Sequence, residues 1–183
     1  AIQRAKVVSW MGAHAPAAFE VPVYQVLEMA RYAQWWQPLT TADHHAIAKA
    51  VAMTGIESLL DRSFNALSEG QQQLVQLTRV LAQQSRFLLL DEAASHLDFE
   101  HVRHVLGILR TLHRQMGVTV VLVSHQLGLL SACTQRVILL GQGHIVADGP
   151  TATVLTDANL QLTFQTTVGF ERTATGTIVP LYE

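Results

Sequence analysis

Two adjacent acidic residues, Asp91 and Glu92, directly follow a short run of apolar residues. A run of this kind that ends in a charged pair predicts a buried strand at the centre of a parallel sheet, here Arg86–Leu90. In open α/β folds, ligands bind at the carboxyl ends of such strands. We therefore expect the two carboxylates to lie where this chain does its chemistry.

A second polar stretch, Leu67–Gln71, stands about twenty residues upstream, at the start of a helical pattern. Apolar residues recur every three to four positions over Gly70–Gln83, which is typical of an amphipathic helix. The free amides and the positive dipole end of such a helix can hold an anion, and Ser68 adds a hydroxyl donor. Alternatively, Ser68 is a plain N-cap, worth about 1 kcal/mol. Both interpretations can hold, because the cap geometry aims the amides.

His125 follows another apolar run, Val118–Val123, which we predict to be a second parallel strand. The pattern over Phe99–Met116 predicts a helix between the two strands. A strand, a crossover helix and a second parallel strand bring both strand ends to the same edge of a sheet. We therefore expect His125 to emerge beside Asp91 and Glu92.

The three stretches, in this order and at these spacings, resemble motifs of the ATP-binding cassette (ABC) ATPases. Leu67–Gln71 resembles the signature motif, Arg86–Glu92 the Walker B motif, and His125 the switch histidine. Ser95–Asp98 is similar to the loop that follows Walker B. The resemblance runs from about Val7 to Leu181. It implies an α/β P-loop NTPase fold, with a RecA-like core, a mostly parallel sheet and an inserted α-helical subdomain.

The resemblance also implies a role for each polar residue. Asp91 binds Mg²⁺ through water, and Glu92 orients and deprotonates the attacking water. His125 donates a hydrogen bond to the γ-phosphate of ATP. In the family, the signature motif contacts the ATP that the opposite subunit of a dimer holds. The resemblance gives this ATP-contacting role to Ser68, Gly70, Gln71 and Asp98. In an alternative interpretation, Asp91 and Glu92 have no catalytic role and only cap the next turn. Capping explains the presence of one carboxylate better than the presence of two.

Three features depart from the family pattern. The phosphate loop, G-x-x-x-x-G-K-[ST], does not occur in these 183 residues, and the chain begins at Ala1. We therefore expect an N-terminally incomplete chain that starts inside a larger domain. Ala13 occupies the position of a magnesium-contacting glutamine, so either the register is off by a residue or two or the contact is lost. Glu69 replaces a glycine and brings a negative charge near a triphosphate.

The resemblance predicts four parts of the chain. Residues 1–13 form the end of the core sheet and the Q-loop region, and residues 14–76 form the helical subdomain that ends in the signature motif. Residues 77–150 hold the RecA-like core, and residues 151–183 form C-terminal helices and a small strand tail. Further predicted elements are a strand at Lys6–Met11, helices at Val23–Trp36 and Thr40–Met53, and a hairpin of Arg136–Leu140 with His144–Asp148.

The composition indicates a packed globular domain, with 49% hydrophobic and 14% charged residues. A net charge of -2 does not favour nucleic acid as a partner. The single cysteine, Cys133, rules out an internal disulfide and suits a reducing compartment. No apolar run approaches the roughly 18 to 20 residues that span a bilayer, so we expect any membrane role to come through a partner.

The expected function is that of the ATP-binding and hydrolysing subunit of an ABC importer, an ABC-type translocase that uses ATP and Mg²⁺. By resemblance, two copies form a homodimer that drives transmembrane permease subunits and serves a periplasmic binding protein indirectly. The expected place is the cytoplasmic face of the inner membrane, as a peripheral subunit. Gly169–Leu181 and Phe19–Val23 look most like the ATPases of vitamin B12 and iron-siderophore importers. The expected cargo is therefore vitamin B12 or a related metal chelate.

Two other functions compete with this expectation. A degenerate module that dimerises or docks without hydrolysis is favoured by Ala13, Glu69 and the missing phosphate loop, and is opposed by Asp91, Glu92 and His125. A DNA-repair ATPase with the same signature would need a long coiled coil before the signature motif, and no sustained heptads occur there. The 183 residues alone are expected to be inactive, because a triphosphate without its glycine-rich cradle loses its main anchor.

Overall fold

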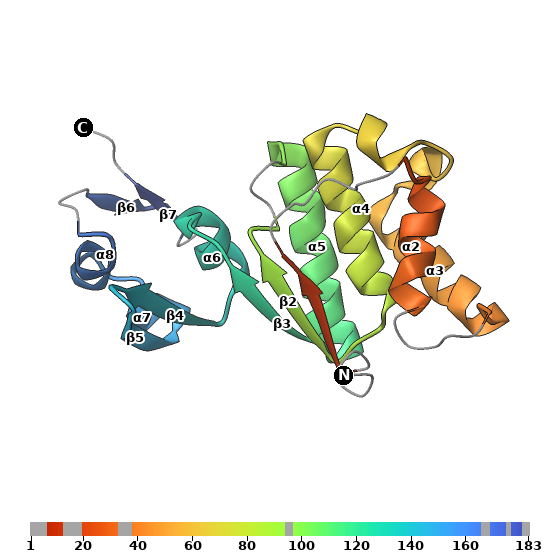
Figure 1. Cartoon of the computed structure of the whole chain (residues 1–183). Helices are drawn as coiled ribbons and strands as arrows, with labels where there is room; N and C mark the ends of the chain where they lie inside the picture. Colours follow the sequence, from red (N-terminus) through yellow and green to blue (C-terminus); the bar gives the residue numbers. More distant parts are fainter. Residues whose placement is uncertain are drawn as a thin grey trace. The chain divides into compact units, whose positions relative to one another are not determined.

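The computed structural model of the chain describes residues 7–12, 20–32, 38–93, 97–165, 169–174 and 177–180. These residues belong to two compact units, Ala1–Val123 and Ser124–Glu183 (Figure 1). Each unit has its own strands, helices and core, so each is described by itself. The acid pair and the signature stretch lie in the first unit, and His125 lies in the second.

A three-stranded parallel sheet is the centre of the first unit. Its order is β1 (Val8–Met11), β2 (Phe87–Asp91) and β3 (Thr119–Val123). The register aligns Phe87 with Val8 on one side and with Thr119 on the other. The predicted parallel arrangement, with the acid-bearing strand in the middle, is confirmed.

Helices of the first unit follow the predicted pattern closely. The α-helices are α2 (Val23–Tyr32), α3 (Thr41–Thr54), α4 (Glu69–Ala82) and α5 (Phe99–Met116), and two short 3₁₀ turns are η1 (Glu57–Leu59) and η2 (Phe64–Ala66). Thr40 caps α3 in a capping box with Asp43. Gly117, with φ 64°, ends α5 in the left-handed region that favours glycine. The predicted continuation of α2 to Trp36 lies outside the described residues.

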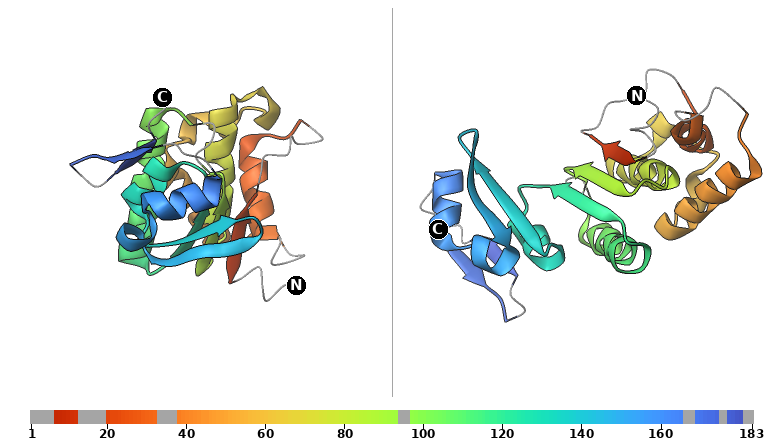
Figure 2. Two further views of the ribbon diagram at one scale, coloured as in Figure 1. Left: turned by 90° about the vertical axis from the view of Figure 1, so that its left-hand side faces the viewer. Right: turned by 90° about the horizontal axis from the view of Figure 1, so that it is seen from below.

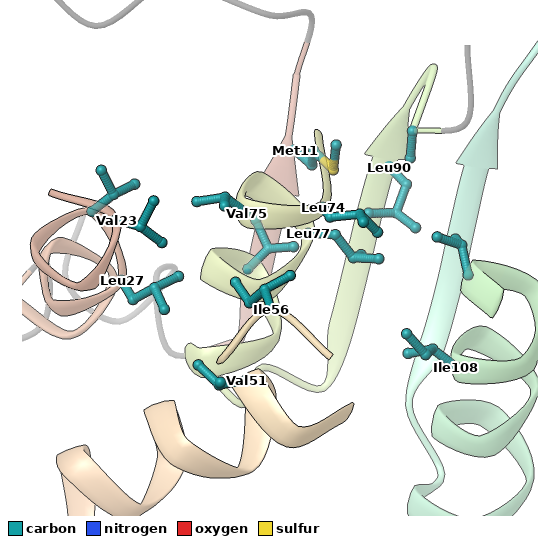
Figure 3. Packing of buried hydrophobic residues seen from close by; sticks show 14 of the residues in the cluster. Met11, Val23, Leu27, Val51, Ile56, Leu74, Val75, Leu77, Leu90 and Ile108 are labelled. Atoms are coloured by element: carbon teal, nitrogen blue, oxygen red, sulfur yellow. The ribbon is translucent and has the colours of Figure 1, made fainter. Parts of the chain in front are cut away.

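Helix α4 packs in the middle of the first unit, against α2, α3 and β1. Its Leu74, Val75 and Leu77 are buried in one apolar cluster with Leu27 of α2 and Leu90 of β2 (Figure 3). The buried part of α4 is wider than the predicted stripe of leucines and valines, because Gln73 and Thr78 are buried as well. The helix therefore touches the sheet on one side and the helical segments on the other.

Helices cover one face of the sheet (Figure 2), and among the described residues the apolar side chains on the other face are exposed. The connections from β1 to β2 and from β2 to β3 run in the same direction, so right-handed crossovers put α4 and α5 on the same face. The exposed face carries apolar residues with exposed fractions of 44 to 60%: Val8, Trp10, Phe87, Val121 and Val123. The predicted burial of the central strand holds for Leu88 and Leu90 of β2, whereas Val121 and Val123 show that the predicted burial of β3 fails on this face.

The second unit consists of short elements around a smaller core. They are α6 (Leu127–Cys133), β4 (Arg136–Gly141), β5 (His144–Pro150), α7 (Thr151–Val154), α8 (Asp157–Phe164), β6 (Phe170–Arg172) and β7 (Ile178–Pro180). The antiparallel pair β4 and β5 confirms the predicted hairpin. Gln142 and Gly143 both have positive φ, as a two-residue type I′ turn requires.

No helix within the described ranges is long and apolar enough to cross a membrane. The longest one, α5, has 18 residues and carries charged side chains along its length.

Candidate functional site

Asp91 and Glu92 lie at the carboxyl edge of the sheet, as predicted. Asp91 is the last residue of β2 and stands opposite Val123, the last residue of β3. The backbone N–H of Glu92 donates to the carbonyl of Val123 over 2.9 Å. The two strands therefore end together, and the acid pair is half-buried at that point.

The backbone of Glu92 has an unusual conformation. Its φ is 53°, in the left-handed region that residues other than glycine rarely adopt and that costs about 1 kcal/mol or more. Two hydrogen bonds hold it there: the bond from its N–H to Val123, and a bond of 2.8 Å that its carbonyl accepts from the side chain of Gln73. The chain thus turns sharply away from the strand after Asp91, and the backbone of Glu92 is held by β3 on one side and by α4 on the other.

Gln73 is the residue of this site that the sequence analysis missed. It lies on α4 with only 7% of its surface exposed, and its amide links the helix that carries the signature stretch to the acid pair. A signal was present, because Gln73 stands four positions before Leu77 and seven before Val80, on the side of the helix that continues as the apolar stripe.

The start of α4 is a capping box. The side chain of Ser68 accepts from the N–H of Gln71 at 3.3 Å, and the side chain of Gln71 accepts from the N–H of Ser68 at 3.2 Å. The predicted N-cap is therefore confirmed. Ser68 and Glu69 are exposed and Gly70 is half-buried, so a ligand from outside can reach the helix start.

Gln72 fixes the segment that leads into α4. Its side-chain amide donates to the carbonyls of Phe64 and Leu67, at 3.1 and 3.2 Å. The apolar side chain of Leu67 is buried, whereas the next residue, Ser68, is exposed. The signature stretch is thus anchored through its first residue and presents its polar residues to solvent.

Asp98 is the N-cap of α5. One of its oxygens, Oδ1, accepts from the N–H of His101 at 2.9 Å and from the ring Nδ1 of the same histidine at 2.7 Å. These hydrogen bonds from His101 hold the pKa of Asp98 below its ordinary value. The structure therefore gives Asp98 a local structural partner, and its contact with ATP stays a prediction.

His125 belongs to the second unit, two residues after the end of β3. The hydroxyl of Ser124 accepts from the N–H of Gln126 at 3.1 Å, in the turn that leads to α6. The expected role of His125 beside Asp91 and Glu92 stays a prediction. Ala13 and Ser95 lie outside the described residues.

The donor set fits a magnesium nucleotide in part. No group of three or more His, Cys, Asp or Glu side chains in the described ranges could hold a metal ion. Asp91 would therefore be one carboxylate in a set that phosphate oxygens and water complete, which is how Mg²⁺ is usually bound. The carboxylates of such a site, Asp91 and Glu92, are present, whereas the phosphate loop that would bind the triphosphate is not in this sequence.

A parallel sheet with helices between its strands, and with an acid pair at the carboxyl end of its middle strand, defines an α/β protein. The structure is similar to one described as an inward-facing conformation of a metal-chelate type ABC transporter, with a TM-score of 0.85 and 26% identity. That match covers 97% of this chain and 73% of the other. A dimeric ATP-binding cassette bound to ADP and Pi, with a TM-score of 0.68, 22% identity and coverages of 82% and 65%, shares the fold. The predicted fold class is confirmed.

The family model described as ABC transporter matches residues 4–95 of this chain, and the chain belongs to this family as an ATP-binding domain. The hemin import ATP-binding protein HmuV of Bordetella avium (strain 197N) is 40% identical over 155 residues, which cover 79% of this chain and 58% of the relative. The achromobactin transport ATP-binding protein CbrD of Dickeya dadantii (strain 3937) is 33% identical over 146 residues, covering 79% and 54%. The chain thus spans little more than half the length of these relatives.

Proposed function

We propose that this chain is the later part of the ATP-hydrolysing subunit of an ABC importer that takes up a metal chelate. The observation that carries the proposal is the acid pair Asp91 and Glu92, held at the carboxyl edge of the sheet by β3 and, through Gln73, by the signature helix. Support for the cargo comes from the relatives, which are named for hemin import and achromobactin transport. Hemin is the first candidate, and the narrower expectation of vitamin B12 stays a prediction.

The proposed roles follow the position of each residue. Bound ATP and Mg²⁺ would supply the phosphoanhydride bond and the charge that neutralises it. Asp91 would hold the hydrated metal ion, and Glu92 would accept the proton of the attacking water. His125 would donate to the γ-phosphate. The exposed start of α4, with Ser68, Gly70 and Gln71, would contact the nucleotide held by a second subunit, and Asp98 would contact it as well.

The open face of the sheet supports a larger complete subunit. Parallel sheets are normally covered by helices on both faces, because their strands are apolar throughout. Here Trp10 is 60% exposed, and Val121 and Val123 of the outer strand are each about half exposed. We propose that a segment outside these 183 residues, carrying the phosphate loop, covers this face in the complete subunit.

The proposed assembly is a homodimer of the complete subunit on the cytoplasmic face of the inner membrane. It would act on transmembrane permease subunits, with a periplasmic binding protein delivering the chelate. The resemblance to the family implies these partners, and the relatives are named as import and transport ATP-binding proteins.

A non-hydrolysing docking module is the second candidate. Its support is Glu69, an exposed acid in the first turn of the signature helix, at a point proposed to meet a triphosphate. A negative charge there would oppose the binding of an anion at the helix start.

The test begins with the complete coding region, expressed with its permease. We expect magnesium-dependent ATP hydrolysis and uptake of hemin into vesicles, and a loss of at least about 100-fold in hydrolysis for Glu92→Gln, because the general base is removed. Glu100→Gln, an exposed acid on α5, is the matched control and should keep normal turnover. Normal turnover by Glu92→Gln would refute the assigned role. Nucleotide-independent dimerisation without hydrolysis would favour the docking module.

A further inference from the structure

A pocket of about 360 Å³ lies in the first unit at the edge of the sheet opposite to the acid pair. Its base is formed by Ser9 and Leu88, the second residues of β1 and β2, which are partners in the sheet. Its sides come from α3, from the last turn of α4 and from the end of α5. This size is within the range of pockets that bind small ligands in proteins.

Most of the pocket surface is apolar. Helix α3 contributes Ala46, Ala50 and Met53, and α5 contributes Leu112 and Met116. Met116, the last residue of α5, lies at this pocket and is 45% exposed. An apolar chain of a ligand would therefore find a matching surface here.

The polar groups at the base of the pocket already have partners. The hydroxyl of Ser9 donates to the hydroxyl of Ser85 over 2.7 Å, and both serines are buried. A ligand therefore needs no polar group at its inner end.

The charged groups of the pocket are both positive. Lys49 and Arg86 line it and are exposed, and no acidic residue is among the lining residues. Neither cation forms an ion pair with a described residue. The last turns of α3, α4 and α5 also line the pocket, and each helix end counts as roughly half a negative charge, so the pocket keeps a net positive charge of about half a unit.

We propose that this pocket binds a small amphipathic anion, with its acidic head between Lys49 and Arg86 and its apolar chain against α3 and α5. A bound molecule would bridge α3 to the sheet and to the end of α4, the helix whose other end carries the signature stretch. The proposal concerns a site at the opposite edge of the sheet from Asp91 and does not depend on the proposed function.

The test uses the 183-residue chain with decanoate, at concentrations below micelle formation, and isothermal titration calorimetry. We expect saturable binding below about 1 mM. Decyltrimethylammonium, which has the same chain and the opposite charge, should bind at least about tenfold more weakly. Absence of saturable binding by decanoate, or equal binding of the cation, would overturn the proposal.

The position of the ligand is tested by NMR of ¹³C-labelled methionine methyl groups. Met53 and Met116 line the pocket and should shift on titration, whereas Met29, exposed on α2, is an internal control and should stay. Equal shifts of all three would mean unspecific adsorption and would contradict the site.

Variants test the role of charge. Lys49→Gln combined with Arg86→Gln should weaken decanoate binding about tenfold, and both side chains are exposed, so the fold should be kept. Arg114→Gln, an exposed arginine of α5 that does not line the pocket, is the matched control. Unchanged affinity in the double variant would overturn the assignment of the two cations.

Discussion

A buried ion pair between Arg31 of α2 and Asp43 of α3 offers a sharp test of what stabilises the first unit. The Nη2 atom of Arg31 lies 2.6 Å from Oδ1 of Asp43, and the two side chains are only 11% and 7% exposed. Arg31 also donates to the carbonyl of Ala82 at the end of α4, at 3.0 Å. Thr40 donates to Oδ2 of Asp43 with its hydroxyl at 2.6 Å and its backbone N–H at 2.9 Å. The ion pair thus joins three helices, because Asp43 belongs to α3, Arg31 belongs to α2, and the guanidinium of Arg31 also bonds to the end of α4.

The magnitude follows from the pKa of Asp43, which lies at about 2 against an ordinary value of 3.8. The hydrogen bonds from Thr40 are the main cause, and Arg31 adds to them against the cost of burial. A shift of this size corresponds to about 2.5 kcal/mol of folding free energy when the carboxylate is charged. Removing one partner of a buried pair costs about 3 to 5 kcal/mol, because the other charge stays buried. We expect Asp43→Asn to cost about 2.5 to 4 kcal/mol at neutral pH.

The sign of the pH dependence follows from the lowered pKa in the folded state. The stabilisation is complete above about pH 4 and is lost as the pH falls from about 4 toward 2. The difference between wild type and Asp43→Asn should therefore shrink over this interval.

Urea unfolding followed by tryptophan fluorescence measures this free energy. All three tryptophans, Trp10, Trp35 and Trp36, belong to the first unit, so the signal reports that unit. Asp148→Asn removes the ion pair with Arg136 in the second unit and should leave the tryptophan signal unchanged. A cost below about 0.5 kcal/mol for Asp43→Asn at pH 7, or a difference that persists at pH 2, would refute the reasoning.

Three further predictions concern the site and the caps, and each is checked by the same unfolding measurement. Glu92→Gly should be about 1 kcal/mol more stable than Glu92→Ala, because only glycine adopts φ 53° without strain; equal stabilities would argue against strain at this turn. Gln73→Leu should cost about 1 to 3 kcal/mol, because it leaves the Glu92 carbonyl without the bond from the buried Gln73 amide; a neutral effect would contradict the link between α4 and the acid pair. Gly117→Ala should destabilise by about 1 kcal/mol at its positive φ, whereas Gly107→Ala, inside α5 with open space around it, should stabilise by up to about 1 kcal/mol. The opposite order of the two alanine variants would refute the assigned helix end.

Much of the candidate site could be predicted because its main residues follow local patterns. The apolar run before Asp91 and Glu92 predicted a strand end, and the residue types around Ser68 predicted a helix cap. The division into four parts along the chain, and the roles of the site residues, stay predictions. The spacing of Gln73 from Leu77 placed it on the buried side of α4, but its role was missed because its partner, the Glu92 carbonyl, is distant in sequence.

The sequence alone determined the elements whose signals lie within a few residues of each other. Thr40 with Asp43 begins α3, Gly117 ends α5, and Gln142 with Gly143 forms the hairpin turn. Each of these features depends on the backbone conformation and hydrogen bonds of a few neighbouring residues. Tertiary structure decided which apolar residues are buried. Trp10 fits an apolar pattern but is exposed, because both crossover helices lie on the other face of the sheet. Met116 is exposed as well, because it is the last residue of α5 and lies at the pocket. The left-handed turn at Glu92 has the same origin, since hydrogen bonds from β3 and α4 hold a conformation that the local sequence does not favour.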